Sequence, residues 1–212
     1  MKIWICTGDK LETTLGVASA CNLFSNSSSQ SCVKISGEKF EDVGVELNTA
    51  RETAFANNNS IDLVTISGAS LALILSDVTI YELMLQLLAM ANSVVFVRMA
   101  PSQKSKVIEL AKSHLNMKVM AIGDGYNDTQ MLQAADCGIR IVKPTSVHDQ
   151  DRAIKAEADF IITNFFQVKK LVLAHGFNSN HQISRLIYFY FYKNVALVGC
   201  EVAFQFVSGF SR

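Results

Sequence analysis

A glycine-rich acidic loop carries the clearest chemistry in the sequence. An apolar run over residues 118–122 ends in Gly-Asp-Gly-Tyr-Asn-Asp at residues 123–128. This pattern is typical of a buried parallel strand that leads through a loop into a helix, where open α/β sheets place their ligand sites. Asp124 and Asp128 supply the hard oxygen ligands that Mg²⁺ prefers beside a phosphate group. An ordinary turn is equally compatible with the spacing of these residues.

The two glycines of this loop, Gly123 and Gly125, predict unusual backbone geometry. Glycine reaches conformations that other residues avoid, and it allows close approach to a ligand. We therefore expect the loop backbone to lie near whatever the two aspartates bind.

A second loop of the same kind follows the first apolar run of the chain. Residues 2–6 are apolar and end in Thr7, Gly8 and Asp9, and a helical pattern starts at Leu11. A hydroxyl group, a glycine and a helix N-terminus together suit the binding of phosphoryl oxygens. Alternatively, Thr7 or Asp9 caps the helix. A strand expected to be central at residues 2–6 leads us to expect further sequence upstream.

A third candidate group lies after the strand expected at residues 94–97. Arg98 ends this strand, Pro101 suits the first turn of a helix, and Lys104 falls within that turn. A cation there opposes the helix dipole unless it faces a bound anion. A solvated surface lysine is the alternative.

The alternation of short strands and helices predicts an α/β fold, with a parallel sheet and helices on both faces. We expect strands at residues 2–6, 32–35, 63–66, 94–97, 118–122, 137–142 and 160–162. We expect helices from 11 and from 101, and at 44–57, 78–92, 129–135 and 152–158, with a turn at 67–68.

Composition limits the possible classes of protein. The 212 residues hold 19 basic and 19 acidic side chains, so net charge gives no indication of nucleic-acid binding. Half of the residues are hydrophobic, which disfavours disorder. The five cysteines have no metal-ligand spacing, so reduced thiols are expected and a zinc site is not.

Residues 186–210 form an apolar and aromatic segment of a different kind. Roughly 25 residues at helical rise can cross a bilayer core of about 30 Å, so we expect a transmembrane helix. Its polar side chains share one sector of about 120°, which should face other helices or a wet path. These side chains are Lys193, Asn194, Glu201, Gln205 and Ser208. An amphipathic surface helix or a buried core helix fits the aromatic density and low charge less well.

The residues before this segment predict its orientation. Basic side chains and histidines gather there, and the positive-inside rule then places the globular part in the cytosol. They are Lys169, Lys170, His175, His181 and Arg185. The expected organisation is a globular domain at 1–165, a connecting helix or stalk at 166–185 and a transmembrane helix at 186–210.

Four motifs in order resemble those of the P-type ATPases, and most of all the phospholipid-translocating branch, the lipid flippases. They are Thr-Gly-Asp-Lys from residue 7, Arg-Met-Ala-Pro-Ser-Gln-Lys from 98, Gly-Asp-Gly-Tyr-Asn-Asp from 123 and Phe-Tyr-Lys-Asn from 191. Four ordered motifs are far more specific than any one of them. The resemblance covers nearly the whole chain and is weakest at residues 25–59.

The resemblance implies the C-terminal part of a phosphorylation domain with a haloacid-dehalogenase-like, Rossmann-type sheet, incomplete at its N-terminus, followed by the fifth membrane helix. It implies that Thr7, Gly8, Asp9, Arg98, Lys104, Asn127 and Asp128 contact nucleotide or phosphate, with Asp9 and Lys104 in catalysis. It also implies Mg²⁺ on Asp124 and Asp128, and a lipid path at Lys193 and Asn194. ATP would be the substrate that drives phospholipid movement.

This sequence departs from the family pattern at one decisive point. The family carries Asp-Lys-Thr-Gly-Thr, whose aspartate is phosphorylated, and the chain has no such run. The actuator, nucleotide-binding and other membrane segments are also missing, and an accessory subunit is an expected partner. Tyr126 stands where the family has a small residue. We therefore expect the chain alone to be inactive.

Two other functions remain as alternatives. A self-contained phosphatase of the haloacid-dehalogenase type needs an Asp-x-Asp at a strand end, and Asp149 and Asp151 form that triplet in a polar stretch. The second alternative is a non-catalytic, membrane-anchored remnant.

Overall fold

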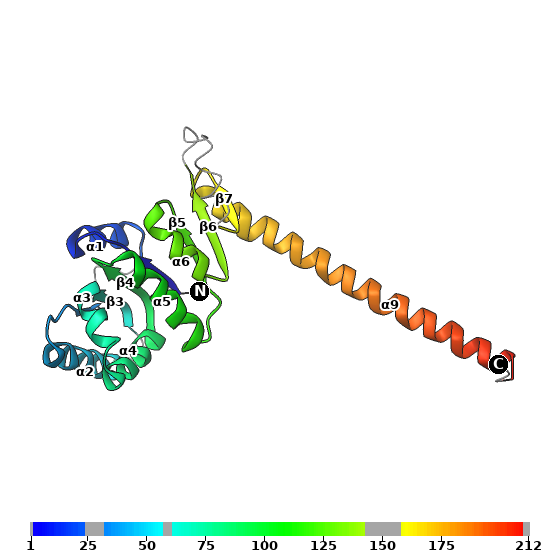
Figure 1. Ribbon diagram of the computed structural model, residues 1–212, viewed down its shortest axis with the longest axis horizontal. Coiled ribbons are helices and arrows are strands. Elements are labelled where there is room, and N and C mark those ends of the chain that lie inside the picture. Colours follow the sequence, from blue (N-terminus) through cyan, green and yellow to red (C-terminus); the bar gives the residue numbers. More distant parts are fainter. Residues whose placement is uncertain (1, 24–31, 57–60, 143–157, 210–212) are drawn as a thin grey trace. The chain divides into compact units, whose positions relative to one another are not determined.

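A computed structural model describes residues 2–23, 32–56, 61–142 and 158–209 (Figure 1). The chain divides into two compact units, with residues 1–140 and 147–161 in the first and residues 141–146 and 162–212 in the second. The helix expected at 152–158, apart from its last residue, and the Asp149 and Asp151 triplet lie outside the described residues.

The first sheet of the globular unit has four strands in the order β1-β4-β3-β2. All three strand pairs are parallel, and Ile5 of β1 lies level with Val95 of β4 and Thr65 of β3. The strands are β1 (Ile3–Cys6), β2 (Cys32–Ile35), β3 (Ile61–Ser67) and β4 (Ala91–Val97). Parallel pairing aligns the carboxyl ends of these strands at one edge, which is where the predicted loops begin.

Helices cover both faces of this sheet, as the sequence predicts. They are α1 (Leu11–Ala20), α2 (Phe40–Ala56), α3 (Gly68–Ile74), α4 (Val78–Met90) and α5 (Pro101–Ser113). On one face, Ala18 of α1 packs against Leu63 and Val95. On the other, the larger core joins the remaining four helices to the strands around Phe96. Each fully buried aliphatic side chain there contributes about 1.5–3 kcal/mol.

A second sheet of three strands, in the order β5-β6-β7, holds the acidic loop. It consists of β5 (Met120–Gly123), β6 (Cys137–Ile141) and β7 (Phe160–Ile162). The 3-10 turn η2 (Tyr126–Asp128) and helix α6 (Thr129–Ala134) follow β5, which pairs with β6 in parallel. A strand, loop and helix unit therefore stands where the acidic motif predicts one.

Three details differ from the sequence-based expectations. The described strands form two sheets rather than one. Strand β1, expected in a central position, lies at the edge of its sheet because β4 is its only partner among the described strands. The turn expected at Ser67 and Gly68 opens helix α3 directly, since the Ser67 hydroxyl accepts the N–H of Ser70 and caps the helix.

The second unit is a helical run. It contains α8 (Phe166–Lys170), a π-helical stretch η3 (Leu171–Gly176) and α9 (Phe177–Val207). The boundary expected between residues 185 and 186 falls inside α9, whose large apolar side chains are mostly exposed.

Across the described residues, no helix is both long and apolar enough to cross a membrane. The transmembrane helix expected at 186–210 is therefore not confirmed. The polar side chains of Lys193, Asn194, Glu201 and Gln205 interrupt the apolar surface of α9 and lower its overall hydrophobicity.

Candidate functional site

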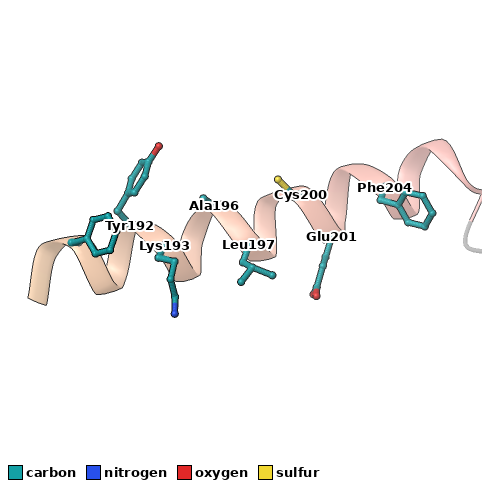
Figure 2. Close-up of a pocket in the computed structure, with 8 residues that line it drawn as sticks. Tyr192, Lys193, Ala196, Leu197, Cys200, Glu201 and Phe204 are labelled. Atoms are coloured by element: carbon teal, nitrogen blue, oxygen red, sulfur yellow. The ribbon is translucent and has the colours of Figure 1, made fainter. Parts of the chain in front are cut away.

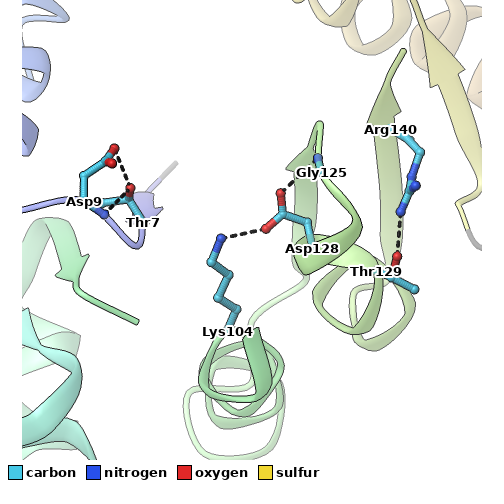
Figure 3. A network of polar contacts seen from close by, with 7 residues as sticks. All are labelled: Thr7, Asp9, Lys104, Gly125, Asp128, Thr129 and Arg140. Carbon is cyan, nitrogen blue, oxygen red and sulfur yellow. Dashed lines mark hydrogen bonds and ion pairs between the residues drawn. The ribbon is translucent and has the colours of Figure 1, made fainter. Parts of the chain in front are cut away.

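An ion pair links two of the predicted site residues (Figure 3). The ammonium nitrogen of Lys104, in the first turn of α5, lies 2.7 Å from Oδ1 of Asp128, at the end of η2. Their side chains are only 13% and 11% exposed. The alternative of a solvated surface lysine is therefore wrong, and the anion that Lys104 faces belongs to the acidic loop itself.

Gly123 makes room for the Asp128 side chain. A Cβ atom on Gly123 would lie 2.6 Å from the Cβ of Asp128 and 2.9 Å from its Oδ2. The close approach predicted at Gly123 is therefore found, but the group that comes close is the Asp128 side chain rather than a ligand. The predicted unusual backbone conformation is not found at either glycine of the loop. Gly125 instead donates its N–H to Oδ2 of Asp128 at 3.4 Å.

The loop of Thr7, Gly8 and Asp9 is closed by its own side chains. The Thr7 hydroxyl donates to Oδ2 of Asp9 at 2.9 Å, and the Asp9 N–H donates to the Thr7 hydroxyl oxygen at 3.1 Å. Neither residue caps α1, since its N-cap is Lys10, which makes no side-chain capping bond. The N-cap alternative is therefore wrong, and the exposed Asp9 carboxylate remains accessible to a ligand.

Backbone hydrogen bonds hold this loop to the end of β4. The Arg98 N–H donates to the Asp9 carbonyl at 3.2 Å, and the Met99 N–H donates to the Thr7 carbonyl at 3.0 Å. The bonded residues are 89 and 92 positions apart in sequence, but the parallel pairing of β1 with β4 brings them to the same edge.

The thiol of Cys6, the last residue of β1, interacts electrostatically with both members of the Lys104–Asp128 ion pair. Burial raises the pKa of its thiol to about 12, Lys104 lowers the pKa and Asp128 raises it. The raised pKa keeps the thiol in its protonated form at neutral pH. Its electrostatic interaction with both partners places the carboxyl end of β1 near the ion pair.

Arg98 lines a cavity to which Lys104 does not contribute. It is exposed, and Lys34 lines the same cavity, to which Asp128 does not contribute either. The structure thus brings Lys104 to Asp128 and Thr7 to Asp9, but it does not gather Arg98 and Lys104 around one space.

The chemistry of the loop fits Mg²⁺ in part. Asp124 and Asn127 are exposed beside the buried Asp128. No three His, Cys, Asp or Glu side chains of the described residues gather closely enough to hold a metal ion by themselves. Mg²⁺ commonly keeps several waters and binds through one or two carboxylates plus substrate phosphates. Asp124 and Asp128 match that limited requirement.

Sequence reasoning did not identify a buried cation beside the acidic loop. Arg140 of β6 is 3% exposed, and its Nη2 donates to the Thr129 hydroxyl at 2.7 Å. Arg140 lies level with Gly123 across the β5–β6 pair. The sequence feature that could have indicated it is a charged residue, Arg140, within an otherwise apolar strand.

The two residues proposed for a lipid path lie on α9, in the second unit. Lys193 and Asn194 are both exposed, and the Lys193 ammonium lies 5.0 Å from the centre of the Tyr190 ring. Figure 2 shows Lys193 and Glu201 pointing to the same side of the helix. This arrangement agrees with the polar sector inferred from the sequence.

Two families match successive parts of the chain. The family described as haloacid dehalogenase-like hydrolase matches residues 71–165, which include Arg98, Lys104 and the acidic loop. The family described as phospholipid-translocating P-type ATPase C-terminal matches residues 156–212.

Curated relatives align with the whole chain. Phospholipid-transporting ATPase VD of Macaca fascicularis is 35% identical over 211 residues, which are 100% of this chain and 31% of the relative. The human protein of that name is 32% identical, and human phospholipid-transporting ATPase IH is 31% identical. Both alignments also cover 100% of this chain, with 16% and 20% of those relatives. The chain thus spans less than a third of the length of these relatives.

Proposed function

Because the chain belongs to the phospholipid-transporting P-type ATPases, we propose that it is one part of a machine that couples ATP hydrolysis to phospholipid movement. The observation that carries this proposal is the Lys104–Asp128 pair at the carboxyl end of β5. It joins the second and third motifs of the predicted phosphoryl-transfer centre.

In this proposal each loop has a separate task. The loop of Thr7, Gly8 and Asp9 would contact the phosphoryl group or the nucleotide. Arg98 and Lys104 would neutralise charge on phosphate oxygens. Asp124 and Asp128 would hold Mg²⁺, and Asn127 would support the phosphate. When bound, the metal supplies positive charge to phosphate oxygens. Lys104, paired with Asp128, fixes the orientation of that carboxylate before any ligand arrives.

We further propose that the aspartate that becomes phosphorylated belongs to a part of the full-length protein outside these 212 residues. The chain contains no Asp-Lys-Thr-Gly-Thr. Among the described strands, β1 pairs only with β4 and β5 pairs only with β6, so each has a free edge. An added parallel strand at these edges would satisfy their backbone groups and deliver its end to the two loops. On this basis the chain alone is inactive.

For α9 we propose a place within a bundle of membrane helices. Its large exposed aromatic surface supports contact with lipid or other apolar helices, and its polar sector would face protein or a wet path. Lys193 and Asn194 would then meet the phospholipid headgroup. The globular unit would lie in the cytosol, and an accessory subunit remains a proposed partner.

The deciding experiment uses the longer reading frame. If Asp-Lys-Thr-Gly-Thr is encoded in frame upstream of Met1, the long product should flip fluorescent phospholipid in vesicles with ATP and Mg²⁺. Lys104→Met should lower this rate by about 100-fold or more, which is typical of losing an electrostatic contact to the transition state. Lys106→Met, an exposed lysine on the same helix, is the matched control.

The 212-residue chain provides the converse test. We expect no transfer of the γ-phosphate of ATP to this chain. A covalent aspartyl-phosphate formed by the chain alone would contradict the proposal that its acceptor lies elsewhere.

A further inference from the structure

Arg140 is a buried cation to which the proposed function gives no task. It lies within β6, it is 3% exposed, and its neighbours on both sides in the strand are isoleucines. Burying a guanidinium group costs free energy unless its N–H groups are hydrogen-bonded, and its planar, forked donors are already arranged for such bonds. A residue of this kind is suited to fixing the position of the group that it contacts.

The contact that Arg140 makes is with the residue that follows the acidic loop. Its Nη2 donates to the Thr129 hydroxyl at 2.7 Å (Figure 3). The Thr129 N–H also donates to the carbonyl of Tyr126, within the loop. Thr129, the first residue of α6, is thus held by its side chain and by its backbone, and Asp128 directly precedes it.

The start of the loop meets Arg140 as well. Gly123 ends β5 and lies level with Arg140 across the parallel β5–β6 pair. Residues 124–128 therefore leave β5 beside the backbone of Arg140 and enter α6 at a residue that its side chain binds. Tying both ends of a short loop to one residue removes much of the freedom that the loop would otherwise lose on binding a ligand.

Close packing of α6 against β6 fixes this geometry. A Cβ atom on Gly138 of β6 would lie 2.7 Å from the Leu132 carbonyl oxygen of α6. The Gly138 N–H donates to Oδ2 of Asp159 at 2.7 Å, which anchors the strand at the same point. The strand that carries Arg140 and the helix that begins at Thr129 therefore have little room to shift past one another.

The other restraints on Asp128 are of a different kind. The Asp128 N–H donates to the Gly125 carbonyl at 3.2 Å, and the Gly125 N–H donates to Oδ2 at 3.4 Å, both at or beyond the upper end of the usual range. Lys104 contacts Oδ1 of the carboxylate itself, so a metal ion would compete with it for that oxygen. Arg140 acts through the neighbouring hydroxyl, and its contact occupies neither carboxylate oxygen.

We propose that Arg140 is a positioning residue that holds the two ends of the acidic loop together and so presets Asp128 for a divalent cation. This inference rests on the proposed function, which assigns Mg²⁺ to Asp124 and Asp128. Contacts that orient a metal ligand from outside the coordination sphere are worth about 10–100-fold in metal affinity. The bond from Arg140 to Thr129 persists when a metal ion binds, because it does not depend on a carboxylate oxygen.

The test is a titration of the whole chain in detergent with Mn²⁺, followed by the electron paramagnetic resonance signal of the free ion. Mn²⁺ takes the same oxygen ligands as Mg²⁺. Thr129→Val keeps the size of the side chain but removes the hydroxyl that Arg140 binds, and the dissociation constant for Mn²⁺ should rise about tenfold. Thr129→Ser restores a hydroxyl and should recover most of the lost affinity.

Two comparisons separate this role from a general effect of substitution. In an Arg140→Met background, Thr129→Val should have no further effect, because the partner of the hydroxyl is already gone. Thr49→Val makes the same change at an exposed position of α2 and should leave the affinity for Mn²⁺ unchanged. The proposal does not depend on the folding of Arg140→Met, since Thr129→Val tests the same bond.

Hydrogen exchange in EDTA examines the loop without any metal. The amides of Asp128 and Thr129 should exchange faster in Thr129→Val than in the wild type, whereas those of Val94 and Phe96 in β4 should keep their rates. Equally faster exchange at all four amides would mean that the bond stabilises the whole unit rather than the loop, and would overturn the proposal.

Asp128→Asn distinguishes failure of this inference from failure of the proposed metal site. If the wild type and Thr129→Val bind Mn²⁺ equally but Asp128→Asn does not bind it, the metal site stands and Arg140 does not position it. Equal Mn²⁺ binding by the wild type and Asp128→Asn, or none by either, would instead overturn the metal site and this inference with it. Equal losses in Thr129→Val and Thr129→Ser would overturn the inference alone, because the hydroxyl would not be responsible.

Discussion

The ammonium nitrogen of Lys104 lies 2.7 Å from Oδ1 of Asp128, and this ion pair joins the first turn of α5 to the turn that follows β5. A lysine at the positive end of a helix is unfavourable by itself. The carboxylate of Asp128 offsets that cost in a place that admits little water. The pair therefore belongs to the fold of the globular unit as well as to its proposed chemistry.

Lys104→Met should destabilise the globular unit by about 3 kcal/mol, because a largely buried carboxylate would lose its counter-ion. Urea unfolding can be followed by fluorescence of Trp4, the one tryptophan of the chain, whose ring lies 5.8 Å from that of Phe96. Lys106→Met provides the exposed control on the same helix. Equal unfolding midpoints for the two variants would contradict a structural role for the pair.

Gly123→Ala should displace Asp128, because the new methyl group would lie within 3 Å of its side chain. We expect a loss of about 1–3 kcal/mol in the free energy of unfolding, as for other overpacked sites. Gly125→Ala is the matched comparison, since its nearest neighbour would be 3.8 Å away. The expectation fails if the alanine at 123 is tolerated as well as the alanine at 125 in urea unfolding.

Much of the fold could be predicted from the sequence because its strands are short apolar runs separated by amphipathic helices. Cys32–Ile35 and Phe160–Ile162 are strands as expected, and Pro101 begins α5. The break between the two sheets could not be predicted, since hydrophobic patterning indicates burial but not which strands pair. For the same reason, β1 was expected in a central position.

The sequence indicates which residue types the candidate site contains, but not which of these residues are in contact. The spacing of Lys104 and Asp128 along the chain gives no indication that α5 would bring them together. The sequence groups Arg98 with Lys104 because both are cations of one motif. In the structure Arg98 has a left-handed backbone and lines a cavity to which Lys104 does not contribute. The contact of Arg140 with Thr129 depends on strand register, which the sequence alone does not determine.

Gly68→Ala should be among the most damaging single-methyl changes in the chain. The added carbon would lie 2.3 Å from the Arg98 carbonyl oxygen, which is backbone and cannot move aside cheaply. We expect a loss of about 3 kcal/mol or more in urea unfolding. Gly44→Ala, within α2 and with nothing near its Cβ position, should instead stabilise the protein by about 0.5–1 kcal/mol. If both substitutions changed the free energy of unfolding in the same direction, this interpretation of the packing would be wrong.

Cys6 should resist alkylation in the folded protein. Burial raises the pKa of its thiol to about 12, so little thiolate forms at pH 8. Cys21 and Cys200 are exposed and should react first with iodoacetamide. Peptide mass mapping before and after unfolding in urea measures the difference. Labelling of Cys6 in the folded chain at the rate of Cys21 would show that its thiol is not protected.

Asp77 should make the stability of the globular unit depend on pH in the acidic range. Hydrogen bonds from Thr79 and Ile80 lower the pKa of this N-cap carboxyl from its ordinary value of 3.8. The folded state therefore binds the proton less readily than the unfolded state. The resulting stabilisation is complete above pH 3.8 and is lost as the pH falls through the lowered pKa.

Asp77→Asn isolates this effect, since asparagine is also a good N-cap but does not titrate. The melting temperature of the wild type should exceed that of Asp77→Asn above about pH 5. This difference should shrink as the pH falls toward about 2, because the Asp77 carboxylate becomes protonated. Glu82→Gln, at an exposed acid on the same helix, is the control variant. A difference between wild type and Asp77→Asn that stays constant from pH 2 to pH 7, within about one degree, would show that charge on the cap contributes nothing to the stability of α4.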